Sequence, residues 1–114
     1  MTVDATAAFA HLADSLVTEE AGVEHGRMMS HPAVTWGGKV FAFRGGNNDL
    51  VFRVGAGFDP TAAGLTDTAP LAPFKTKPPI RGWLRVSATH ADRWRELALL
   101  ALREMRAGQD SPGV

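Results

Sequence analysis

The chain has 114 residues, of which 45% are hydrophobic and 21% are charged, and these values are typical of one soluble globular domain. The absence of cysteine excludes disulfide bonds and thiolate metal sites, and it fits a reducing compartment. The N-terminal stretch lacks the pattern of a secretory signal, and no apolar run approaches the roughly 20 residues of a membrane span. We therefore expect a cytoplasmic protein without a membrane partner.

The twelve basic and twelve acidic residues balance to a formal net charge of zero, but they are unevenly distributed. Residues 1–38 hold one basic residue and five acids, whereas residues 39–114 hold eleven basic residues and seven acids. Overall neutrality disfavours a dedicated, tight nucleic-acid binder, which usually carries a clear basic excess. The excess of basic residues in the second part of the chain indicates the chemistry of binding partners, and it does not indicate the fold.

The first element is predicted to be a helix from about Asp4 to Ala21. Apolar residues recur there at helical spacing, and Gly22 provides a stop signal. The frequent alanines suit a helix that lies close against a sheet. The residues with this spacing are Phe9, Leu12, Ala13, Leu16 and Val17.

Three short strands are predicted next, at residues 33–36, 39–44 and 50–54. Gly37-Gly38 forms the first turn. The second turn, residues 45–49, is rich in glycine and asparagine, which tolerate positive φ. The last two strands therefore form an antiparallel hairpin, and the first strand extends the hairpin to a meander.

Residues 55–79 are predicted to be a long connection without regular strands. Asp59-Pro60 has the pattern of one capped helical turn that ends at Gly64. Leu71 and Phe74 are expected to hold the connection to the body of the domain. Connections of this length are uncommon in compact domains and tend to be functional or mobile. The residues that keep the chain extended and out of regular structure are Pro70, Pro73, Pro78 and Pro79.

A fourth strand is predicted at residues 80–86, and a second helix from Thr89 to about Arg106. The helix begins with a pattern close to a capping box, and its apolar residues form one broad stripe. Residues 107–114 should fray as a flexible tail. The predicted fold is a single α+β domain of residues 1–106, in which an antiparallel four-stranded sheet is flanked by N- and C-terminal helices in the order α-βββ-β-α.

Part of this pattern resembles two known families. The segment AGVEHGRMMSHPAVTWGGKVFAFRGGNNDLVFRV is similar to YjbR-like proteins, in which a Gly-Val-Glu helix end leads to a proline, a Gly-Lys turn and a hairpin. The run GRMM…GGKVFAF resembles the N-terminal domain of TfoX-like proteins, although Met29 stands where that family usually has phenylalanine, and SHPA replaces the glycines that follow. The PF…RGWLRV segment and the closing leucine-rich helix are similar to both families, so the resemblance covers residues 15–106.

The resemblance implies an α+β domain without a known catalytic constellation. YjbR-like proteins are often described as DNA-binding, and TfoX-like proteins are associated with the regulation of competence. Neither family supplies a catalytic residue that could be carried over to this chain.

Strand alternation predicts a surface of arginines around one tryptophan on the sheet face opposite the core. The side chains expected to face the core are Phe41, Phe43, Leu50, Phe52 and Val54, which leaves Val40, Ala42 and Val51 on the other face. An aromatic ring amid guanidinium groups can stack a nucleic-acid base or anchor a protein partner, and arginines can equally solvate an exposed sheet. The residues of this predicted surface are Arg44, Arg53, Arg81, Trp83 and Arg85.

Histidines near the end of the first predicted helix do not form a recognisable metal or catalytic motif. His25 and His31 lack the i, i+4 spacing of zinc ligands on a helix. Ser30 lies beside His31 without the turn that presents a catalytic serine. We therefore expect no metal site, no cofactor and no enzymatic activity.

The sequence predicts a small non-enzymatic module that binds another protein or a second copy of itself. The alternative is weak, salt-sensitive binding of DNA or RNA through the same face, and binding of a small ligand beside residues 55–79 has less support. Lys75 and Lys77 in that connection could close over an anion, although such lysines more often keep a loop soluble.

Overall fold

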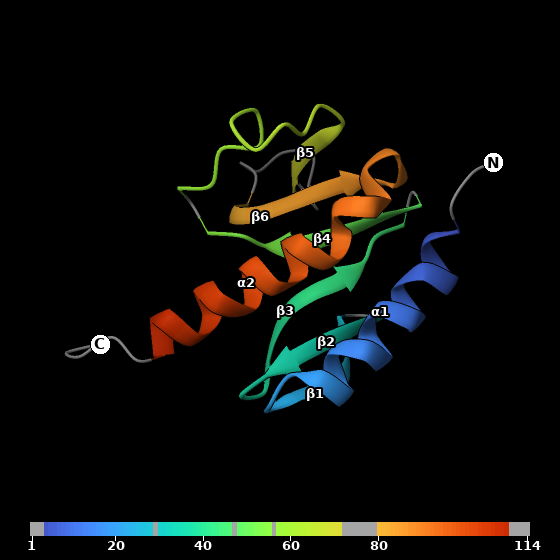
Figure 1. The fold of residues 1–114 in the computed structure, drawn as a ribbon, viewed down its shortest axis with the longest axis vertical. Helices are drawn as coiled ribbons and strands as arrows, with labels where there is room; N and C mark the ends of the chain where they lie inside the picture. The colour runs from blue at the N-terminus through green and yellow to red at the C-terminus, as the bar shows by residue number, and fades with distance from the viewer. Residues whose placement is uncertain (1–3, 29, 47, 56, 72–79, 110–114) are drawn as a thin grey trace.

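The computed structural model describes residues 4–28, 30–46, 48–55, 57–71 and 80–109, and it has two layers. One layer is an antiparallel sheet with the strand order β1-β2-β3-β4-β6-β5, and the other consists of helices α1 and α2, which cover one face of that sheet (Figure 1). The helical elements are α1 (Ala5–Glu19), η1 (Ala88–Arg93) and α2 (Trp94–Gln109). The strands are β1 (Val23–Met28), β2 (His31–Trp36), β3 (Lys39–Arg44), β4 (Asp49–Arg53), β5 (Thr68–Leu71) and β6 (Ile80–Ser87).

The α+β prediction is confirmed, but the sheet has six strands instead of four. Strand β1 was not predicted from the sequence. Its residues, VEHGRM, include only one buried residue, Val23, so buried and exposed side chains do not alternate along it. The second additional strand, β5, lies inside the connection that was predicted to hold no strand. Both are edge strands, and an edge tolerates Pro70 because one side of the strand needs no partner.

Helix α1 begins where two side chains satisfy its first backbone N–H groups. Oδ1 of Asp4 accepts a hydrogen bond from the N–H of Thr6 at 3.0 Å, which is the expected action of an N-cap. Oδ1 of Asn48, in the turn between β3 and β4, accepts from the N–H of Ala5 at 2.8 Å. The start of the first helix is therefore fixed to the central hairpin.

The second helical segment departs from the predicted single helix. The chain leaves β6 at Ser87, whose Oγ accepts from the N–H of Thr89 at 3.2 Å, and it passes through the 3-10 helix η1 before α2 begins at Trp94. His90 has non-helical φ and ψ values, so the two helical pieces meet at a kink. The apolar stripe of α2 nevertheless faces the sheet as predicted.

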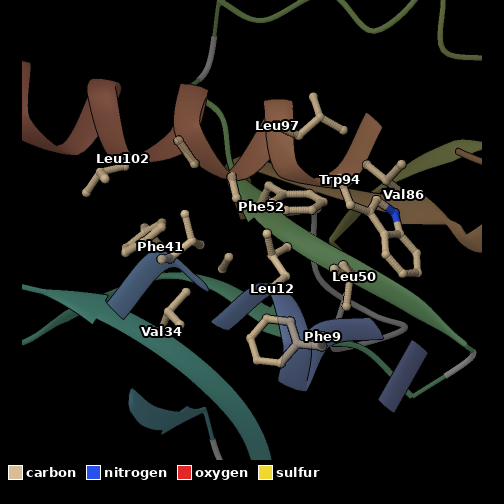
Figure 2. Packing of buried hydrophobic residues seen from close by; sticks show 14 of the residues in the cluster. Phe9, Leu12, Val34, Phe41, Leu50, Phe52, Val86, Trp94, Leu97 and Leu102 are labelled. Carbon is tan, nitrogen blue, oxygen red and sulfur yellow. The ribbon is translucent and has the colours of Figure 1, made fainter. Parts of the chain in front are cut away.

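The main core lies between the helices and the sheet (Figure 2). Fully buried side chains come from both layers, and burial of each large one stabilises the fold by about 1.5–3 kcal/mol. Figure 2 shows labelled side chains of α1 and of α2 gathered around those of the sheet strands. Besides Trp94, the largest buried side chains of this core are Phe9, Leu16, Phe41, Leu50, Phe52, Leu97 and Leu102.

A β-bulge in β3 changes which side chains reach this core. Val34 pairs with Ala42 and Thr35 pairs with Val40, so Phe41 is an extra residue without a partner on β2. Phe41 and Ala42 consequently both face the helices. Phe43 then faces the other side of the sheet, where it joins a separate cluster. The prediction that Phe41 and Phe43 share the core face is therefore wrong, because the bulge interrupts regular alternation.

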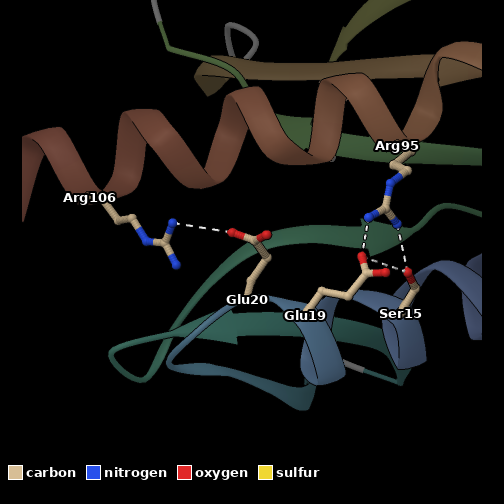
Figure 3. Close-up of polar contacts among 5 residues, drawn as sticks. All are labelled: Ser15, Glu19, Glu20, Arg95 and Arg106. Atoms are coloured by element: carbon tan, nitrogen blue, oxygen red, sulfur yellow. Dashed lines mark hydrogen bonds and ion pairs between the residues drawn. The ribbon is translucent and has the colours of Figure 1, made fainter.

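Five polar side chains tie α1 and the residue that follows it to α2 across the helical layer (Figure 3). Arg95 of α2 donates hydrogen bonds to Glu19 and, at 2.6 Å, to Ser15 of α1. Nη1 of Arg106 lies 3.3 Å from Oε1 of Glu20, and its Nη2 donates to the backbone carbonyl of Ala21 at 3.0 Å. These contacts set the relative position of the two helices at the solvent side of the core.

The part of the connection before β5 folds as the sequence predicts. Oδ1 of Asp59 accepts hydrogen bonds from two backbone N–H groups of the following turn, and Gly64 ends that turn with φ +81°. Nε2 of His90 then accepts from the N–H groups of Thr66 and Asp67 at 3.1 and 3.0 Å. This histidine therefore anchors the chain to η1 just before β5 begins.

No helix among the described residues is both long and apolar enough to cross a membrane.

Candidate functional site

A second, smaller apolar cluster lies on the sheet face opposite the helices. Its described members come from the strands alone, so neither helix covers it. We call this surface the aromatic face and define it by Met28, Ala33, Val40, Phe43, Val51 and Trp83.

The aromatic face is organised around a pair of rings. The ring centroids of Phe43 and Trp83 are 5.7 Å apart with an angle of 55° between the planes, a tilted arrangement that is favourable for aromatic pairs. Phe43 on β3 is 6% exposed, and Val51 on β4, the strand between β3 and β6, is 1% exposed. Trp83 on β6 is half-buried. The ring of Trp83 therefore packs against Phe43 and keeps part of its surface accessible to solvent.

Arg85, which follows Trp83 by two residues on β6, is bound to Asp49. Nη2 and Nε of Arg85 lie 2.7 and 3.1 Å from Oδ2 of Asp49. The Arg85 side chain is 29% exposed and the Asp49 side chain is 10% exposed. Because the carboxylate offsets the guanidinium charge, this end of the aromatic face is not strongly basic.

The structure does not bring the predicted arginines together around Trp83. Arg44 lies opposite Leu50, a core residue, and its guanidinium group contacts Nδ1 of His31 at 3.4 Å. Arg53 pairs with Trp83 in the register of β4 and β6, but its Nη1 reaches Sδ of Met105 on α2 at 3.3 Å. The predicted common surface of arginines is therefore wrong for Arg44, which the bulge displaces, and for Arg53, which turns to the helical layer.

Of the other predicted site residues, only Trp83 and Arg85 occupy the expected face with described side chains. The backbone of Arg81 belongs to β6, but its side chain lies outside the described part of the structure. Lys75 and Lys77 also lie outside the described residues, as does Phe74.

A shallow cleft runs along one flank of Trp83, beside the connection between β4 and β5. It has a volume of about 280 Å³, and Phe58, Pro60 and Pro70 are among its lining residues. Val54 and Leu84 in the same lining belong to the cluster beneath the helices. The N–H of Gly55 donates to the carbonyl of Gly82 at 3.1 Å, and both glycines line the cleft. Sequence reasoning missed the contribution of Pro70, because a proline was taken as evidence against a strand.

The histidines do not assemble a metal site. Among the described residues, no group of three histidine, aspartate or glutamate side chains is placed to hold a metal ion. Nε2 of His25 lies 3.1 Å from Oδ1 of Asp14, and both side chains are more than half exposed. This pair links β1 to α1.

No family model, curated protein or solved structure matches this chain.

Proposed function

We propose that the protein is a small non-enzymatic module that binds another protein through the aromatic face. The observation that carries the proposal is the pair of Phe43 and Trp83 on a sheet face that neither helix covers. Tryptophan is enriched among the residues that dominate binding energy at protein interfaces, where a rigid ring fills a pocket of the partner. Phe43 supports the ring of Trp83 and reduces the entropy lost when a partner binds.

The polar surroundings of the pair also suit a protein partner. Arg85 is held in place by Asp49 but keeps part of its guanidinium group exposed. A positioned arginine beside an aromatic residue can donate hydrogen bonds to backbone carbonyls at the rim of an interface.

Weak binding of DNA or RNA through the same face is the less favoured alternative. Nucleic-acid affinity depends on cations that neutralise phosphates. Arg85 is already paired with Asp49, and Arg53 contacts Met105 on the helical side. The similarity of the sequence to TfoX-like proteins also supports a protein partner. We include membership of that family and a cytoplasmic location in the proposal.

The test compares Trp83→Ala with Arg103→Ala, a control on the exposed side of α2. Each protein is used as bait, and bound proteins are identified by mass spectrometry, while light scattering measures self-association. We expect one protein, or a second copy of the chain, to bind the wild type and the control and to be lost from Trp83→Ala. Equal binding by all three baits, or no binding by any, would overturn the proposal.

A titration with fluorescent single-stranded and duplex DNA separates the alternative. Binding that weakens steeply with added salt, and that Trp83→Ala removes, would replace the protein partner with nucleic acid. Absence of binding at low salt would remove nucleic acid from consideration.

A further inference from the structure

A groove lies between α1 and the outer part of the sheet formed by β1 and β2. It has a volume of about 550 Å³, which is within the range of small-molecule sites. Residues of α1 form one wall, and residues of β1 and β2 form the other.

The apolar lining of the groove comes from both of its walls. Ala10 of α1 and Pro32 of β2 are exposed at its surface, whereas Ala13 and Phe9 lie beneath them and are 2% and 1% exposed. The methyl groups of the two alanines fill little of the space between the helix and the strands, so the surface between them stays hollow.

The polar side chains of the groove leave one cation available. His25 is engaged with Asp14 at 3.1 Å across the groove. Arg27 lines the same groove from β1, and it is exposed. Its side chain makes no hydrogen bond or ion pair with any residue that the structure describes. An arginine with unused donors can bind a carboxylate through two parallel hydrogen bonds.

We propose that this groove binds a small organic carboxylate with an apolar body. The carboxylate pairs with Arg27, and the apolar body packs against the exposed side chains of Ala10 and Pro32. The carboxylate of Asp14 disfavours a doubly charged ligand such as a phosphate monoester, because it adds a second negative charge to the same groove. Of the residues that define the aromatic face, only Ala33 lines this groove, and it is 1% exposed, so the proposal does not rest on the function proposed above.

Octanoate tests the ligand class. Its binding is measured by the chemical shifts of backbone amides in the full-length protein. Acetate has the charge without the apolar body, and 1-octanol has the apolar body without the charge. We expect octanoate to cause saturable shifts at residues 9–14 and 25–27, and the other two compounds to bind at least about tenfold more weakly. No saturable shift with octanoate, or shifts spread over the whole chain, would overturn the proposal.

Two variants separate the roles of charge and space. Arg27→Gln should weaken octanoate binding about tenfold, whereas Arg103→Gln, which removes an exposed arginine from α2, should leave it unchanged. Ala10→Leu, at an exposed position of α1, should block the groove and weaken binding without unfolding the protein. Trp83→Ala should not alter octanoate affinity. Equal affinity of the wild type, Arg27→Gln and Ala10→Leu would show that the groove is not the site.

Discussion

Arg85 donates two hydrogen bonds to a single carboxylate oxygen of Asp49, from Nη2 at 2.7 Å and from Nε at 3.1 Å. The other oxygen, Oδ1, is buried and has no hydrogen-bond partner among the residues that the structure describes. The pair joins β6 to the first residue of β4, next to the aromatic face. It therefore links the hairpin turn to the strand that carries Trp83.

Removing the cation of this pair should destabilise the protein more than removing both charges. Arg85→Leu leaves the carboxylate of Asp49 buried without a partner, and we expect the free energy of unfolding to fall by about 2–4 kcal/mol. The double variant Arg85→Leu with Asp49→Asn should recover part of that loss. Urea unfolding of the wild type and of both single and double variants measures the effect. A double variant less stable than Arg85→Leu would contradict this account of the pair.

Gly45 should be intolerant of any side chain, because a Cβ at this position would lie 1.8 Å from Oδ1 of Asp49. We expect Gly45→Ala to lower the free energy of unfolding by at least about 2 kcal/mol, since the carboxylate must move away from Arg85. The neighbouring Gly46 is the matched control, because a Cβ there would meet nothing within 4 Å. Thermal unfolding should show Gly46→Ala within about 0.5 kcal/mol of the wild type. Similar losses for both variants would point to the turn backbone instead of the carboxylate.

Phe43 and Trp83 should differ in their contributions to stability. Phe43 is almost fully buried although it faces away from the helices, so Phe43→Ala should lower the free energy of unfolding by about 3 kcal/mol. Trp83 is half-buried, and Trp83→Ala should lower it by about 1 kcal/mol. Urea unfolding of the two variants provides the comparison. If Trp83→Ala is as damaging as Phe43→Ala, Trp83 belongs to the core and is unavailable to a partner.

The contact between Glu19 and Arg95 should make stability depend on pH. The hydrogen bond and positive charge of Arg95 lower the pKa of Glu19 below its ordinary value. A lowered pKa in the folded state stabilises the fold above the pKa of the unfolded state, and this contribution is lost as the pH falls through the folded-state value. The difference in stability between the wild type and Glu19→Gln should therefore shrink between about pH 6 and about pH 3.

The pH dependence of stability that comes from this contact should be small and sensitive to salt, because the side chains of Glu19 and Arg95 are both about half exposed. Urea unfolding at several pH values measures it, and Arg95→Gln should give the same profile because it removes the other half of the contact. A constant difference between the wild type and Glu19→Gln from neutral to acidic pH would show that the ion pair does not contribute.

Elements with a strong periodic pattern could be predicted from the sequence. Helix α1, the β3–β4 hairpin and the apolar stripe of α2 follow directly from the spacing of their apolar residues and from their turn residues. The turn at Asp59 was also predictable, since the capping side chain, the proline and the final glycine are local signals. Each of these features depends on neighbours in the sequence.

Features that depend on tertiary pairing could not be predicted in this way. Strand β1 has few buried side chains and forms because β2 offers a pairing edge. Strand β5 contains Pro70, which is compatible with a strand only at the edge of a sheet. The positions of Arg44 and Arg53 could not be predicted either, because they depend on the bulge and on the reach of a long side chain to α2.

The additional residue at Phe41 has a consequence for the evolution of this chain. Because Phe41 and Ala42 both face the helices, a one-codon deletion of Phe41 would restore regular alternation, leave Val40 and Phe43 on the aromatic face, and remove one large side chain from the core. Homologues can therefore lose this residue without exchanging the two faces of the strand, provided that other core side chains fill the space of its ring.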